Sequence, residues 1–134
     1  MTKIESKERA INSSAERIFS FLSDFNNFES LMPSKVSEWT STKESCYFTI
    51  SGIANLGMKF FDKTPSSQIK MVNDGKVPFK FNFIIDIKPS ETETKSIVKL
   101  TFDADLNPML KVVAVSPLKD FLESLLNHLE EHKF

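Results

Sequence analysis

The segment HLEEH, residues 128–132, places two histidines four residues apart, which is the spacing of two metal ligands on one face of a helix. The segment also matches the H-x-x-E-H pattern of inverted zinc proteases. A catalytic zinc ion needs a third protein ligand in an open cleft, whereas the sequence ends two residues beyond the motif. The helix dipole favours histidine near the carboxyl end of a helix, which accounts for His128 and His132 without a metal ion. We therefore predict no metal site and no cofactor.

Nucleophilic catalysis has no candidate residues either. The single cysteine, Cys46, begins a predicted strand whose inward neighbours are apolar, so we expect a small buried side chain there. Both histidines lie far away in the last predicted helix, and three glycines are too few for a phosphate-binding loop. We assign no catalytic residue, and the sequence does not favour an enzyme.

Two carboxylates share the inward phase of predicted strands with apolar residues. Glu8 lies in the alternating segment 2–11. Asp62 follows Met58 and Phe60 in the predicted strand 56–63. A buried carboxyl group would have a raised pKa and could orient a ligand hydroxyl or act as a general acid or base. The alternative is a wet position at the edge of the sheet. Glu8 and Asp62 are thus the candidate polar groups of a cavity.

The length and composition of the chain limit the number of domains and the classes of partner. The 134 residues are enough for one domain, 1–134, and the net charge of −1 gives no field that would attract nucleic acid. No apolar run approaches the roughly 18 residues of a membrane span, and the first twenty residues lack a signal peptide, so we expect a cytoplasmic protein. Thirteen phenylalanines either fill a core or line an apolar cavity.

Hydrophobic periodicity predicts the elements. A strand over 2–11 precedes a helix that starts at a capping box of Ser13 and Glu16, and a second short helical turn ends at Pro33. Strands follow over 36–42, 46–51, 56–63, 67–73, 78–88 and 96–106, with a hairpin turn at NDG, 73–75. The chain ends in a long helix, which Pro117 should kink or divide.

The pattern predicts an α+β fold, with a curved antiparallel sheet of seven strands, two short helices between strands 1 and 2, and a long C-terminal helix across the apolar face. Three segments, SSAERIFSFLSDFNNFESLMP, FTISGIANLGMKF and LNPMLKVVAVSPLKDFLESLLNHL, resemble the START-like superfamily, which includes the birch-pollen-allergen and polyketide cyclase/dehydrase groups. The resemblance covers nearly the whole chain. It implies a helix-grip fold whose sheet wraps around the terminal helix, with a cavity for lipids, isoprenoids, quinones or polyketide-like molecules.

We expect the cavity to be lined by inward side chains of the strands and of the last helix. They are Phe48, Met58, Phe60, Met71, Phe81, Phe83, Phe102, Leu118, Leu122 and Leu125. Where many large-cavity relatives have small residues this chain has phenylalanines, so the alternative is plain core packing.

Three functions follow. The first is a binding or carrier protein for a small hydrophobic molecule. The second is a protein-interaction module with a vestigial cavity, in which Phe28, Leu31 and Met32, or Met109, Leu110, Val112 and Val113, are exposed. The third is a cyclase or dehydratase that uses the same cavity. We expect a small hydrophobic partner, leave a protein partner open, and expect neither nucleic acid nor stable membrane insertion.

Overall fold

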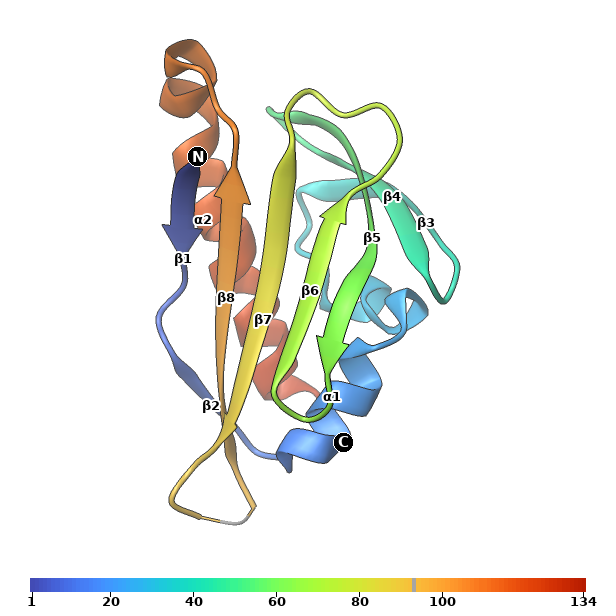
Figure 1. Ribbon diagram of the computed structural model, residues 1–134, viewed down its shortest axis with the longest axis vertical. Coiled ribbons are helices and arrows are strands. Elements are labelled where there is room, and N and C mark those ends of the chain that lie inside the picture. The colour runs from blue at the N-terminus through green and yellow to red at the C-terminus, as the bar shows by residue number, and fades with distance from the viewer. Residues whose placement is uncertain (93) are drawn as a thin grey trace.

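Strands of one antiparallel sheet and a long helix near the carboxyl end dominate the fold (Figure 1). The computed structural model describes residues 1–92 and 94–134. Within these ranges the strands are β1 (Thr2–Glu5), β2 (Arg9–Ile11), β3 (Val36–Ser41), β4 (Ser45–Ile50), β5 (Ala54–Thr64), β6 (Gln68–Asn73), β7 (Phe81–Pro89) and β8 (Ser96–Ala104). The helices are α1 (Ala15–Leu22), the short 3-10 helices η1 (Phe25–Asn27) and η2 (Glu29–Leu31), and α2 (Pro108–Glu131).

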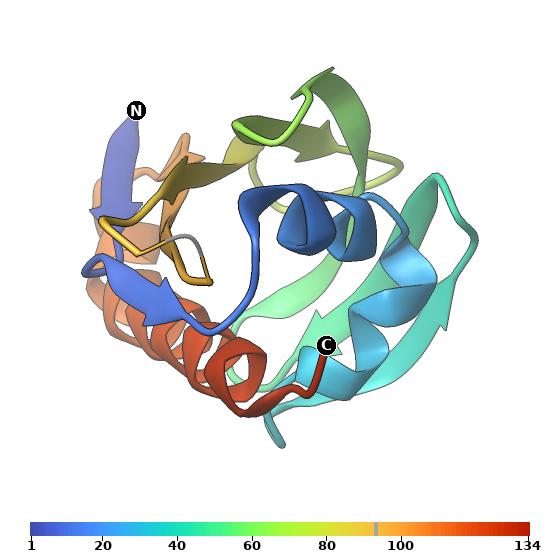
Figure 2. The ribbon, with the colours of Figure 1, turned by 90° about the horizontal axis from the view of Figure 1, so that it is seen from below.

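The sheet follows the order β1-β8-β7-β6-β5-β4-β3, and β2 also pairs with β8. Consecutive strands from β3 to β8 are antiparallel neighbours, and β8 returns the chain to the first strand. Seen along the strands, the sheet and α2 surround a common interior, and α1 lies across one end of it (Figure 2). The predicted α+β class, antiparallel sheet and long terminal helix are confirmed.

The predicted first strand, 2–11, is interrupted. The Ser6 amide donates to the Leu100 carbonyl at 2.9 Å, and the Leu100 amide donates to the Ser6 hydroxyl at 2.9 Å instead of to a backbone carbonyl. The irregularity moves the alternation by one residue, because Ile4 and Ser6 are buried before it and Ile11 is buried after it. Residues 2–5 and 9–11 are therefore separate strands, both paired with β8.

Helix α1 begins one residue later than the capping box predicts. Ser14 is the N-cap, and its hydroxyl accepts a hydrogen bond from the Arg17 amide at 3.2 Å. The Ser13 hydroxyl is buried without a partner in the part of the chain that the structure describes. After α1, the Asp24 carboxylate accepts from the Asn26 amide at 2.9 Å and starts η1, so the chain turns twice before β3.

Two later predictions also need correction. The connection between β6 and β7 spans residues 74–80 rather than a tight NDG turn, although the two strands do form a hairpin. Helix α2 is not divided at Pro117: it runs through the proline after Asn107 caps its start by accepting from the Leu110 amide at 2.8 Å. Burial of Ala114 and Leu118 on either side of Pro117 holds both halves against the sheet.

Candidate functional site

A groove of about 330 Å³ lies between the middle of α2 and the edge of the sheet formed by β3 and β4. Helix α2 packs against β1, β2, β8 and η2, so its other side faces the edge strand β3 across this groove (Figure 2). The lining residues come from the segment that leads into β3, the end of β4 and α2: Pro33, Ser34, Lys35, Val36, Ile50, Pro117, Asp120, Phe121, Glu123 and Ser124.

The base of the groove is apolar. Val36 and Ile50 are opposite each other in the β3–β4 ladder, and Phe121 reaches the same space from α2. The Phe121 ring lies 6.1 Å from the Phe48 ring with an interplanar angle of 10°, and Phe48 stacks on Trp39 at 5.4 Å. Phe48 and Phe121 belong to the buried core, so a molecule that contacts Phe121 in the groove would contact the edge of that core.

The rim of the groove carries charge of both signs. Lys35 stands on the sheet side, while Asp120 and Glu123 stand on α2. Lys35 and Asp120 are exposed, and neither takes part in an ion pair within residues 1–92 and 94–134. These two groups are therefore free to pair with the polar end of a bound molecule.

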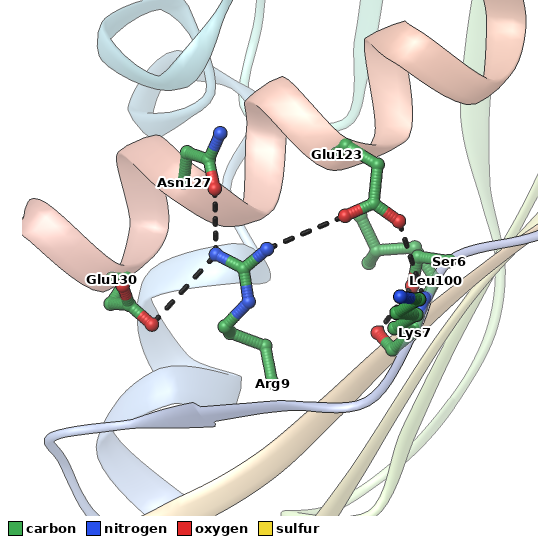
Figure 3. Close-up of polar contacts among 7 residues, drawn as sticks. All are labelled: Ser6, Lys7, Arg9, Leu100, Glu123, Asn127 and Glu130. Atoms are coloured by element: carbon green, nitrogen blue, oxygen red, sulfur yellow. Dashed lines mark hydrogen bonds and ion pairs between the residues drawn. The ribbon is translucent and has the colours of Figure 1, made fainter.

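Glu123 is held from the opposite side of α2 by Arg9 (Figure 3). The Arg9 guanidinium lies 3.4 Å from the Glu123 carboxylate and 3.8 Å from that of Glu130, and it donates to the Asn127 side-chain oxygen at 2.6 Å. The Lys7 amide donates to the second oxygen of Glu123 at 3.3 Å. This cluster ties α2 to β2 and fixes the orientation of one groove residue.

The residues predicted to line a cavity belong to the buried core, and none of them lines the groove. Nine of the ten are at most 4% exposed, and Phe60 is partly buried. Their rings pack on one another: Phe81 and Phe102 stack at 4.7 Å, and Phe83 lies 6.0 Å from Phe102. These ring contacts are those that the alternative of plain core packing predicts.

Glu8 and Asp62 both lie on the surface rather than in the interior. Glu8 follows the shift in alternation at Ser6, and its carboxylate pairs with Lys88 at 2.7 Å, which lowers its pKa instead of raising it. Asp62 follows a register shift in the β5–β6 ladder between Phe60 and Asp62. An interruption between β1 and β2 and an irregularity within β5 thus reverse the faces that simple alternation predicts for Glu8 and Asp62.

The remaining reactive side chains are engaged in structural contacts. Cys46 is fully buried, and burial raises the pKa of its thiol, so it is no nucleophile in the native state. A ring nitrogen of His128 lies 2.7 Å from the Leu31 carbonyl oxygen, and His132 packs against Phe21 at 4.4 Å. In the described ranges no three metal-binding side chains lie together, and no helix is long and apolar enough to cross a membrane.

Among the groove residues, the sequence pattern gives a partial prediction for Phe121. Its place in the apolar stripe of the last helix predicts burial, but not that it stacks on Phe48 at the base of a groove. Lys35, Asp120 and Glu123 gave no signal, because exposed charged residues are common on any surface. Their proximity depends on how α2 sits relative to β3.

The same arrangement of strands and helices occurs in solved structures. A START superfamily protein from Mycobacterium smegmatis has a TM-score of 0.72 and 18% identity, covering 96% of this chain and 94% of its own. XoxI from Bacillus cereus (TM-score 0.77, 12% identity, 98% and 94% coverage) and CV1439 from Chromobacterium violaceum (0.73, 12%, 98% and 96%) are similar. Neither a family sequence model nor a curated protein matches the chain. The fold is thus START-like.

Proposed function

We propose that this protein binds a small apolar molecule with a polar end in the groove between α2 and the β3–β4 edge. The observation that carries the proposal is the combination of an apolar base, made by Val36, Ile50 and Phe121, with a charged rim. Small-molecule sites are typically apolar clefts of about 300–1,000 Å³ with a few polar groups that set orientation. A groove of about 330 Å³ suits a ligand at the small end of this range.

The fold supports the same class of function. The START-like resemblance implies binding of lipids, isoprenoids, quinones or similar molecules in a cavity between sheet and terminal helix, and the groove lies between α2 and the edge of the same sheet. Phe121 is 3% exposed and its ring lies 6.1 Å from that of Phe48, so the proposed ligand contacts the edge of the core rather than the centre of the molecule. A ligand with one acyl chain or one ring system is small enough for a groove of about 330 Å³.

The proposal is tested with a fluorescent fatty-acid analogue titrated into the purified protein. Ser124, half-buried in the groove wall, is replaced by phenylalanine to fill the groove, and exposed Lys119, on the same helix outside the lining, receives the same substitution as the control. We expect saturable binding that Ser124→Phe weakens about tenfold or more, which corresponds to ~1.4 kcal/mol. Lys119→Phe should bind like the unmodified protein. Binding that neither variant changes, or no saturable binding of the analogue, would contradict the proposal.

A second candidate is a protein-interaction module, which the exposed apolar residues at the start of α2 favour: Met109, Val112 and Val113. Phe28 and Leu31, the other segment considered for that role, are buried and do not offer such a surface. A cyclase or dehydratase lacks its proposed carboxylates, since Glu8 and Asp62 lie outside the interior.

A further inference from the structure

The groove wall opposite α2 is a short turn, residues 33–36, which we call the wall turn. The Val36 amide donates to the Pro33 carbonyl at 3.0 Å and closes the turn. The Ser51 amide donates to the Lys35 carbonyl at 3.0 Å and joins the turn to the end of β4. These two hydrogen bonds place the wall turn relative to the sheet, but neither of them involves α2.

A separate connection joins the start of the wall turn to α2. Helix η2 ends at Leu31, two residues before the turn, and lies beside the carboxyl-terminal part of α2 (Figure 2). Nδ1 of His128 lies 2.7 Å from the Leu31 carbonyl oxygen, although the two residues are 97 positions apart in the sequence. Because a carbonyl oxygen only accepts, the His128 ring carries a proton on Nδ1 and donates it.

His128 lies just beyond the groove on α2. It follows the groove residue Ser124 by four positions, so it stands one turn further along the same face of the helix. Within residues 1–92 and 94–134, no other hydrogen bond and no ion pair joins α2 to residues 29–36. The polar contact between the two walls therefore lies at the end of the groove nearest His128.

The Leu31 carbonyl depends on the imidazole for a hydrogen bond. Leu31 is the last residue of η2, so its carbonyl has no amide partner within that helix. The residue is also 1% exposed, and a buried carbonyl without a hydrogen bond costs free energy. Loss of the His128 ring would therefore favour a movement of η2 and the wall turn that brings this carbonyl to water.

We propose that His128 is a positioning residue of the groove. Its hydrogen bond to Leu31 sets the distance between the wall turn and α2, and this distance limits the groove to narrow, unbranched chains. A narrow chain contacts both walls only when they are close, because dispersion attraction falls steeply across a gap of even 1 Å. The preference for ligand shape rests on the function proposed above, whereas the position of the wall turn does not.

Amide hydrogen exchange of the unliganded protein tests the position of the wall turn. His128→Ala removes the donor, His128→Asn keeps an N–H donor near the place of Nδ1, and His132→Ala removes a histidine that packs on Phe21 instead. We expect His128→Ala to accelerate exchange of the Val36 amide about threefold to tenfold, with no change in β6, β7 and β8. His128→Asn should return the rate toward that of the unmodified protein, and His132→Ala should leave it unchanged.

The second measurement compares the affinities for a straight-chain fatty acid and a methyl-branched fatty acid of the same length, each by displacement of the fluorescent analogue. The unmodified protein, His128→Asn and His132→Ala should prefer the straight chain, and His128→Ala should lose about threefold or more of this preference.

An unchanged exchange rate of Val36 in His128→Ala, a preference that this variant retains, or equal effects of His128→Ala and His132→Ala would overturn the inference. If neither fatty acid binds any variant while the exchange of Val36 responds as expected, the proposed function fails and the role of His128 in placing the wall turn stands.

Discussion

The side chain of Tyr47 contacts both Asp74 and Gly57, and these contacts affect its pKa and the residue type at position 57. Its hydroxyl donates to the Asp74 carboxylate at 2.5 Å, and its ring lies over Gly57, where an added Cβ would stand 2.6 Å from the ring. Glycine at this position of β5 is therefore required by the close approach of the ring. The hydrogen bond to Asp74 raises the pKa of Tyr47, because the phenol donates to a carboxylate that its ionised form would repel.

Because the chain contains a single tyrosine, phenolate absorbance measures this pKa directly. We expect Tyr47 to ionise above the ordinary value of 10.0, and Asp74→Asn to return its pKa toward that value. Lys59→Gln, which removes only the 3.9 Å ion pair to Asp74, is the control and should leave the elevated pKa of Tyr47 in place.

Since the folded-state pKa of Tyr47 is raised, its hydrogen bond to Asp74 stabilises the fold below the unfolded-state pKa of Tyr47. This contribution is lost as the pH rises through the folded-state pKa. Identical titration curves for the unmodified protein and Asp74→Asn would contradict this assignment.

At individual positions the sequence predicted burial well where a strand is regular and poorly where it is not. Phe81, Phe83 and Phe102 lie in unbroken alternating strands, and all three are buried as alternation predicts. Glu8 and Asp62 follow irregularities that no local pattern indicates, because those irregularities depend on hydrogen bonds to β8 and on pairing with β6. Glu8 and Asp62 are exposed, which is the alternative of a wet position that the sequence left open.

The attachment of α2 to the sheet involves two kinds of contact. Its buried face packs in the core through leucines, whereas Arg9 of β2 connects to the exposed side through Glu123, Asn127 and Glu130 (Figure 3). The Arg9 side chain is 25% exposed and that of Glu123 is 30% exposed, so solvent screens this pair less than a fully exposed one. Arg9 does not line the groove, but it contacts Glu123, which does.

We therefore expect Arg9→Ala to reduce the free energy of unfolding by about 1–2 kcal/mol, from the loss of a charge-assisted hydrogen bond and two weak ion pairs. Urea unfolding measures the change, with an unchanged m-value as the sign that the native fold persists. Arg17→Ala is the matched control, because Arg17 is exposed on α1 and its side chain makes no ion pair within the described residues. An equal loss of stability in both variants would show that the Arg9 contacts add nothing specific.

The sequence periodicity predicts most of the helices and strands, and most of the differences from the structure concern the residues at which these elements begin and end. The strands from β3 to β8 and the helix after Asn107 were predicted within a few residues, because hydrophobic alternation and capping are local properties. Of the two outcomes predicted at Pro117, a kink or a division, the division does not occur, since burial on both sides of the proline offsets the hydrogen bond that the proline cannot make. The groove could not be predicted, because it depends on the distance between α2 and β3, which no local pattern sets.

In the molecule as a whole, the buried core and the groove occupy different places. The sheet, α1 and α2 enclose a core rich in phenylalanine, while the space left between α2 and β3 forms the groove. The exposed Met109, Val112 and Val113 stand near the start of the same helix that forms one wall of the groove. The binding site proposed above therefore lies at the edge of the sheet and not among the core side chains.

Amide chemical-shift mapping by nuclear magnetic resonance with a medium-chain fatty acid tests the groove as the binding site most directly. The account predicts saturable shifts concentrated in two segments far apart in the sequence, residues 33–36 and 117–124. Shifts confined to the core strands β6, β7 and β8, or no shifts at saturating fatty acid, would contradict it.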